Sequence, residues 1–316
     1  MKKNEIIALT LVTIASIIWG VSFVSKEVLM AEIHPGSLIA FQFIWVSIIL
    51  GIYNFLIKKR FTITKKDFFS LAGTGIIGMF LYNVFINMGI RDTNSSIVSV
   101  LLSLIPIICL FVERIVYKRH FSGLKVICIL GSIIGVYMII GSGGMGSGGS
   151  LAGYMYIIIG VFFWVAFCFI SDKYYSRYDT TEILMVQGLG AVAVSFVYLI
   201  IYPIHLGGID LELFLHFFVI IILNACLSFA FYIYSIRELG VTVTNVFNNV
   251  VPVVTLFVNI VVFDVEIGLM SLIGTGVIIT SVAILNIFDK RRDECDMNLN
   301  VESKYAEAVN QNYNEN

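Results

Sequence analysis

Asparagine side chains recur at helical spacing inside a long apolar stretch of the sequence. Asn245, Asn248 and Asn249, followed by Pro252, occupy positions i, i+3, i+4 and i+7, which share one face of a helix. An unpaired amide buried among apolar groups costs about 1–3 kcal/mol. These amides must therefore face one another or water, where they can hold a polar solute by hydrogen bonds.

Three further apolar stretches carry similar polar stripes, which consist of Tyr82, Asn83 and Asn87, of Ser95, Ser99 and Ser103, and of Asn224, Ser228 and Tyr232. Ser and Asn also join membrane helices through hydrogen bonds worth about 0.6–2 kcal/mol each, so helix packing explains any single residue equally well. Four stripes together favour a hydrated central cavity. The predicted substrate-binding residues are Trp19, Tyr82, Asn83, Asn87, Ser99, Ser103, Trp164, Ser228, Tyr232, Asn245, Asn248 and Asn249.

Other residues of these stretches have expected roles beside the cavity. Trp19 and Trp164 lie within apolar stretches, where they either wall the cavity or pack in the core. Pro106 and Pro252 each remove a helical hydrogen bond, so we expect kinks that act as hinges. Glu113 is the candidate for proton coupling, and an interfacial ion pair is its alternative.

Several kinds of chemistry are not indicated. The five cysteines and four histidines show no paired spacing, so we expect no metal site, disulfide frame or cofactor. A GxGxxG match in the Gly/Ser-rich segment 141–150 lacks the strand that a nucleotide site needs. The net charge of -1 offers no footprint for nucleic acid. Because no GxSG-type nucleophile occurs in a suitable segment, we expect no enzyme activity.

The elements that carry these residues are predicted to cross a membrane. Apolar residues make up 59% of the 316 residues and charged residues 13%, against about 45–50% and 25% in soluble domains. Apolar runs of about 18 residues or more indicate spanning helices. We expect an all-α integral membrane protein with ten transmembrane helices. The expected spans are 6–25, 36–57, 68–90, 94–117, 122–141, 151–172, 182–203, 212–235, 241–263 and 267–288.

The distribution of Lys and Arg predicts the orientation. Basic residues of short loops lie on the cytoplasmic side. With both termini cytoplasmic, the basic clusters at 58–66, 114–125 and 290–292 fall inside, and Lys26 and Arg91 are left outside.

The chain also contains an internal repeat. At one offset Ile90-Arg91 matches Ile236-Arg237 and Pro106 matches Pro252, and at a nearly equal offset Trp19 matches Trp164. Because each unit has five helices, the second copy enters the membrane from the opposite side, as in many secondary transporters. The predicted divisions are a first repeat 1–140, a linker 141–150, a second repeat 151–288 and a disordered cytoplasmic tail 289–316.

Small residues mark the remaining two spans. Gly131 and Gly135 form a GxxxG pair, and Gly274, Gly276 and Ser281 line the last span. Such residues allow helix backbones to approach closely. The approach is expected within the monomer or between the copies of a homodimer.

These residues resemble a known family. Trp19-Gly20-Val21-Ser22-Phe23 resembles the first-helix signature of the EamA family, in the drug/metabolite transporter (DMT) superfamily. The resemblance covers residues 6–288. Its other parts are Tyr82 to Arg91 with Ser103-Leu104-Ile105-Pro106, repeated as Phe231 to Arg237 with Asn249-Val250-Val251-Pro252.

The resemblance implies a ten-helix, inverted-repeat carrier of small metabolites that often works in efflux. It implies a cavity lined by the first, third, fourth, sixth, eighth and ninth helices, with the fifth and tenth at the periphery. Gln42 stands where many members carry a basic residue, so an anion-binding arginine is not carried over to this position.

We therefore expect a secondary transporter of the bacterial cytoplasmic membrane. It would export an amino acid or a related polar or amphipathic solute by alternating access, with the solute and the lipid bilayer as its partners. Proton coupling and facilitated diffusion both stay open. The alternatives from other classes are a non-transporting membrane receptor or scaffold and, ranked below it, an integral membrane enzyme.

Overall fold

The structure is a computed structural model that describes most of the chain. It covers residues 3–117, 149–204, 210–264 and 272–281 continuously, with residues 268–270 and single positions between 127 and 138 and at 284. Within this part every regular element is a helix. Most of the linker 141–150 and all of the tail 289–316 lie outside the described residues.

Eight helical segments of the described part are long and apolar enough to cross a membrane. The expected fifth and tenth spans fall largely outside the described residues, although Leu272–Ser281 forms a shorter apolar helix. Ten spans are therefore not established. The eight segments are α1 (Lys3–Met30); α2 (Pro35–Ile52) with η1 (Tyr53–Ile57); α3 (Lys65–Gly75), η2 (Ile76–Leu81) and α4 (Tyr82–Asp92); α5 (Ser95–Leu102) with α6 (Ile105–Tyr117); α8 (Leu151–Tyr175); α9 (Thr180–Ile201); α10 (Leu211–Phe218), η3 (Val219–Ser228) and α11 (Phe229–Leu239); and α12 (Val241–Val246), η4 (Phe247–Asn249) and α13 (Val250–Phe263).

Short polar side chains define where many of these helices begin. Thr64 accepts a hydrogen bond from the backbone of the first turn of α3, and Asn94 does the same for α5. A side-chain oxygen at this position satisfies a backbone N–H that has no partner within the helix. Ser150, Asp179 and Asp210 cap α8, α9 and α10 in the same way.

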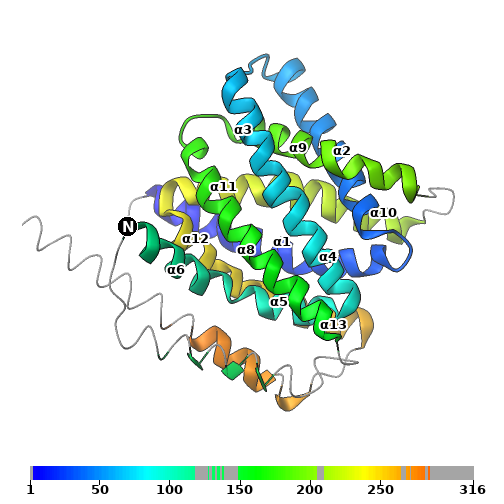
Figure 1. The fold of residues 1–316 in the computed structure, drawn as a ribbon, viewed down its shortest axis with the longest axis vertical. Helices are drawn as coiled ribbons and strands as arrows, with labels where there is room; N and C mark the ends of the chain where they lie inside the picture. The colour runs from blue at the N-terminus through cyan, green and yellow to red at the C-terminus, as the bar shows by residue number, and fades with distance from the viewer. Residues whose placement is uncertain are drawn as a thin grey trace, which may run out of the picture.

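The helices of the two halves of the chain interleave (Figure 1). The most extensive contacts join α2 to α9, α4 to α8, and α1 to α13 and α11. Each pair takes one helix from the first half and one from the second. The third span, which contains α4, packs on the sixth span, α8. The first span, α1, packs on the eighth, which contains α11. The first span matches the sixth and the third matches the eighth, so two related units make equivalent contacts with each other.

The α1–α13 contact depends on a glycine. A Cβ atom placed on Gly20 would lie 2.7 Å from the Cβ of Val254 and 3.1 Å from the backbone oxygen of Val251. The hydroxyl of Thr255 in α13 donates to the backbone oxygen of Gly20 at 3.1 Å. The glycine of the Trp19-Gly20 pair is therefore required for close packing of the two helices.

Repeat-related helices are irregular at corresponding places. The third span contains the π-helical segment η2 and the eighth span contains η3. The fourth span breaks between Leu102 and Ile105, just before Pro106, and the ninth span tightens into η4 just before Pro252. A proline ring clashes with the carbonyl four residues earlier, which explains why each irregularity precedes its proline.

Contacts between the halves join the α2 segment and its following loop to the start of α9 at one end, here called the basic end. The Lys58 ammonium lies 2.5 Å from the Asp179 carboxylate, and Glu182 accepts hydrogen bonds from the backbone and hydroxyl of Thr62. The loops at this end also contain Lys59, Arg60, Lys65, Lys66 and Arg177.

At the other end, here called the opposite end, different contacts join the start of α2 to the end of α9. The hydroxyl of Ser37 lies 2.7 Å from the backbone oxygen of Tyr202, and His34 stacks on the Tyr202 ring at 4.1 Å. His34 also accepts a hydrogen bond from the backbone N–H of Gly36 and so caps α2. Burial, together with the charge of Arg91, lowers the pKa of His34, which favours the neutral ring that capping requires.

Candidate functional site

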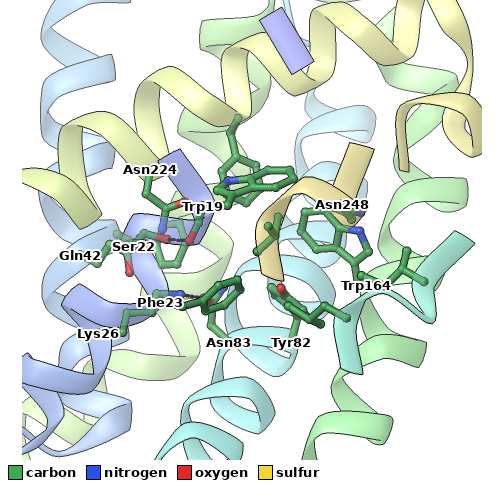
Figure 2. A pocket seen from close by; sticks show the side chains of 15 residues that line it. Trp19, Ser22, Phe23, Lys26, Gln42, Tyr82, Asn83, Trp164, Asn224 and Asn248 are labelled. Carbon is green, nitrogen blue, oxygen red and sulfur yellow. Dashed lines mark hydrogen bonds between the residues drawn. The ribbon is translucent and has the colours of Figure 1, made fainter. Parts of the chain in front are cut away.

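A cavity lies at the centre of the molecule, between the two halves of the chain (Figure 2). Its free volume is about 30 Å³, which holds about two water molecules. The wall combines polar and aromatic side chains from seven of the eight spanning segments, all except α9. The lining residues are Trp19, Ser22, Phe23, Lys26, Gln42, Phe43, Tyr82, Asn83, Leu102, Ile105, Trp164, Asn224, Phe229, Asn248 and Val251.

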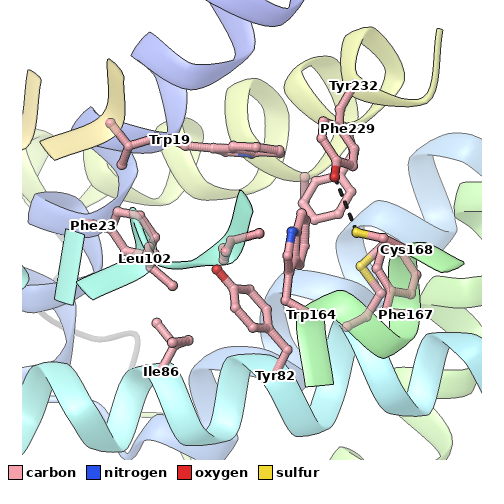
Figure 3. Packing of buried hydrophobic residues seen from close by; sticks show 14 of the residues in the cluster. Trp19, Phe23, Tyr82, Ile86, Leu102, Trp164, Phe167, Cys168, Phe229 and Tyr232 are labelled. Carbon is pink, nitrogen blue, oxygen red and sulfur yellow. Dashed lines mark hydrogen bonds between the residues drawn. The ribbon is translucent and has the colours of Figure 1, made fainter. Parts of the chain in front are cut away.

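Two tryptophans from matching positions of the two halves meet at the cavity. The rings of Trp19 and Trp164 contact each other edge to face, with centroids 5.6 Å apart and planes at 89°. Tyr82 lies 4.8 Å from Trp164, and Tyr232 lies 5.0 Å from Trp19. Figure 3 shows these rings as one cluster with Phe23 and Phe229. They form a rigid wall suited to an apolar or flat group.

Asn245 holds part of this wall from behind. Its side-chain oxygen accepts hydrogen bonds from the indole of Trp164 at 3.0 Å, the hydroxyl of Tyr232 at 2.9 Å and the amide of Asn248 at 2.9 Å. Its own amide donates to the backbone oxygen of Val241. Asn245 is fully buried and is not among the lining residues, so the geometry gives it a positioning role.

The polar part of the wall is built around Lys26. The Lys26 ammonium donates to the side-chain oxygen of Asn83 at 2.8 Å, and the Asn83 amide donates to the backbone oxygen of Met79. Gln42 donates to the backbone oxygen of Ile220 in η3, so the irregular segment of the eighth span is tied to the second span.

The predicted binding residues divide into those at the cavity and those away from it. Trp19, Tyr82, Asn83, Trp164 and Asn248 line the cavity, and Tyr232 and Asn245 support its wall. The hydroxyls of Ser99 and Ser228 bond to backbone oxygens of their own segments. Asn87, Ser103 and Asn249 are buried outside the cavity wall, and each has a side-chain oxygen that finds no hydrogen-bond partner within the described part of the chain.

The predicted hinge prolines, the candidate coupling residue and the small residues of the fifth and tenth spans lie outside this group of binding residues. Pro106 and Pro252 each follow a break or a tightened turn whose neighbours, Ile105 and Val251, line the cavity. The side chain of Glu113 lies outside the described part of the structure. Gly131 faces Ser281, and Gly135 faces Gly274 and Ile278, so the small residues of the fifth and tenth spans meet within one chain.

Lys26 is the main site residue that the sequence reasoning missed. The expected first span ended at residue 25, and Lys26 was placed outside. The structure continues α1 to Met30, and the Lys26 side chain is 3% exposed. A usable signal was present, because Trp19, Ser22, Phe23 and Lys26 fall at i, i+3, i+4 and i+7. Gln42 and Asn224 also line the cavity.

The cavity wall offers hydrogen-bond donors, amide oxygens and one ammonium group, but a metal would need a different set. Within the residues that the structure describes, no three His, Cys, Asp or Glu side chains gather as metal ligands. The arrangement suits binding of a small organic solute.

Comparisons with known proteins identify the family of the chain. The model of the EamA-like transporter family matches the chain twice, over residues 6–141 and 151–287. The Bacillus subtilis protein named "Uncharacterized transporter YyaM" is 26% identical over 84% of this chain and 89% of its own length. The Salmonella typhimurium protein named "Uncharacterized inner membrane transporter YicL" is 22% identical over 89% of this chain and 95% of its own length.

A solved structure shares the fold. It is titled "Crystal structure of protein", superimposes with a TM-score of 0.63 at 16% identity, and covers 91% of this chain and 99% of its own. The two matches to the family model together cover most of the chain, and relatives named as transporters align over nearly their whole length. The protein is a multi-span membrane protein, helical throughout the part that the structure describes, and belongs to the EamA-like transporter family.

Proposed function

We propose that the protein is a secondary carrier that exports a small metabolite across the bacterial cytoplasmic membrane by alternating access. The substrate would be an amino acid or a related polar or amphipathic solute. The observation that carries the proposal is the meeting of Trp19 and Trp164 at a cavity lined by both halves of the chain. A site shared by two related units can be exposed to either side when the units move against each other.

In the proposed mechanism, the contacts at the two ends would act as gates. In this structure the halves touch at the basic end through Thr62 and Glu182, and at the opposite end through Ser37 and Tyr202. The central volume is too small for an amino acid, so the conformation corresponds to a narrow, occluded state. Opening would use the breaks before Pro106 and Pro252 as hinges, because a break in the hydrogen-bond ladder lets a helix bend.

The orientation and the repeat limits belong to the same proposal. Basic loops favour the cytoplasmic side, so the basic end and both termini would lie in the cytoplasm. The repeats would be inverted five-helix units at 1–140 and 151–288, joined by the linker 141–150 and followed by the tail 289–316.

The predicted residues receive separate roles. Trp19, Tyr82, Asn83, Trp164 and Asn248 would contact the solute, since they line the cavity. Tyr232 and Asn245 would position them. Asn87, Ser99, Ser103, Ser228 and Asn249 would be reached by water or solute as the halves open. We assign no enzyme activity to the protein.

Transport by reconstituted protein tests the proposal. Proteoliposomes would be screened by counterflow against amino acids, carboxylic acids, nucleobases and cationic drugs. We expect Trp164→Ala to lower the rate of the transported solute at least tenfold, because the variant removes half of the central tryptophan pair. Trp45→Ala is the matched control, since Trp45 lies on the outer surface and is 44% exposed.

Two results would contradict the carrier. The first is an absence of counterflow for every solute of the panel. The second is equal rates for Trp164→Ala, Trp45→Ala and the unchanged protein. Binding of a solute without any flux would favour the receptor alternative.

A further inference from the structure

Lys26 places a cation in the centre of the molecule. Its side chain is 3% exposed, and its ammonium group forms one hydrogen bond to the described residues, to the side-chain oxygen of Asn83 at 2.8 Å. A lysine ammonium has three N–H donors. Two of them therefore remain for a group inside the cavity.

The neighbouring acidic residue does not neutralise Lys26. Glu27 uses its carboxylate to accept the backbone N–H of Ser95 at 2.8 Å. Among the described residues, no carboxylate lies within 4.0 Å of the Lys26 ammonium, and the described ion pairs join Lys58 to Asp179 and Arg91 to Asp92. The ring of Phe23 lies 5.7 Å from the ammonium, and Tyr82 lines the same cavity.

A buried cation without a counter-charge is costly. Removal of an ammonium from water is repaid only by an opposite charge and a full set of hydrogen bonds. A neutral amide such as Asn83 supplies one hydrogen bond and no charge. An anionic group that enters the cavity would supply the opposite charge and the further hydrogen bonds.

The shape of the cavity adds a second requirement. Figure 2 places Lys26, Asn83 and Gln42 toward one part of the wall, and Trp164 and Asn248 toward another, with Trp19 between them. The charged group is thus beside an aromatic wall. One lysine matches a single negative charge, which favours a carboxylate over a phosphate dianion.

We propose that Lys26 is the anion-binding residue of this cavity, and that the carrier selects small solutes with one carboxylate and an apolar body. This inference rests on the proposed function and names its substrate class. The carboxylate would pair with the two free donors of Lys26, and the apolar body would lie against Trp19 and Tyr82.

Matched pairs of probes test the charge requirement on the unchanged protein. Calorimetric titration in detergent would compare 3-phenylpropionate with 3-phenylpropionamide, which differ in the carboxylate alone. L-phenylalanine forms a separate arm, because it distinguishes a zwitterion from a simple carboxylic acid. We expect at least one carboxylate probe to bind about 30-fold or more tightly than the neutral amide, as for loss of one partner of a buried charge pair.

Variants test the residue. Lys26→Gln is expected to lose the preference for the carboxylate, and Lys26→Arg to keep it. Lys65→Gln is the matched control, because Lys65 is an exposed lysine at the basic end. If Lys26→Gln does not fold, Asn83→Leu serves in its place, since it removes the hydrogen bond that orients Lys26, and we expect weaker carboxylate binding.

The outcomes separate the two proposals. Equal binding of carboxylate and amide, no binding of either carboxylate probe, or an unchanged preference in Lys26→Gln would overturn the role of Lys26. Counterflow of neutral or cationic solutes by the same preparation would leave the carrier intact in that case. Carboxylate binding that depends on Lys26, without flux of any solute, would support the site and contradict the carrier.

Discussion

At the scale of single residues, helical spacing predicts which polar residues share a helix face, but not which of them line the cavity and which support its wall. Asn83, Asn245 and Asn248 were predicted on spacing alone, and two of them line the cavity. Asn245 instead holds Trp164 and Tyr232. Spacing defines the face of a helix, whereas the depth of a side chain behind that face depends on neighbours far away in sequence. Lys26 was missed for a related reason, because a charge was taken to end its span.

The position of Asn245 leads to a prediction about stability. Asn245→Leu removes the acceptor shared by Trp164, Tyr232 and Asn248, and leaves buried donors without partners. Each unsatisfied donor costs about 1–3 kcal/mol, so thermal unfolding in detergent is expected at a clearly lower temperature.

Asn245→Asp is the matched variant for this prediction. It keeps an oxygen acceptor for Trp164 and Tyr232, so it is expected to unfold above Asn245→Leu. Equal unfolding temperatures for Asn245→Leu and the unchanged protein would show that the three hydrogen bonds do not hold the wall.

At the scale of helices, the sequence predicted the eight described spans well, because long apolar runs have one solution in lipid. It did not predict the π-helical segments η2 and η3, since no residue type marks them. The prolines did predict irregular places. The breaks lie about one turn before Pro106 and Pro252, because the clash acts on the earlier carbonyl.

The close approach of α1 and α13 gives a second prediction. Gly20→Ala is expected to destabilise the protein by about 1–3 kcal/mol, as overpacking does in a tight core. The added methyl group would meet the Cβ of Val254 at 2.7 Å. Thermal unfolding in detergent measures the effect.

Gly73→Ala is the control for this substitution. Gly73 lies in α3, and among the described residues a Cβ placed there meets no atom within 4 Å apart from its chain neighbours and the nearby backbone of α3. Alanine favours a helix more than glycine does, so this variant is expected to unfold at the same or a slightly higher temperature. A harmless Gly20→Ala would mean that α13 can shift away from α1 at little cost.

At the scale of the whole molecule, residues that match between the first and second halves of the sequence predict two related units. The family model matches the chain twice. Which helices touch could not be read from the sequence. The repeat shows that the two halves of the chain resemble each other. The packing of α4 on α8 and of α2 on α9 depends on shape complementarity between the halves. At both ends the halves are consequently joined by contacts between segments far apart in sequence.

The contacts at the two ends allow a prediction about the transport cycle. If they are gates as proposed, the carrier separates Ser37 from Tyr202 in one step and Thr62 from Glu182 in another. Cysteine pairs at these positions, Ser37→Cys with Tyr202→Cys and Thr62→Cys with Glu182→Cys, are each expected to stop counterflow when joined by a short bifunctional methanethiosulfonate cross-linker and to regain it on reduction. The four single variants, treated alike, control for effects of each substitution. If transport continues with either end cross-linked, the halves do not separate there, and the solute must take a path that leaves that closure intact.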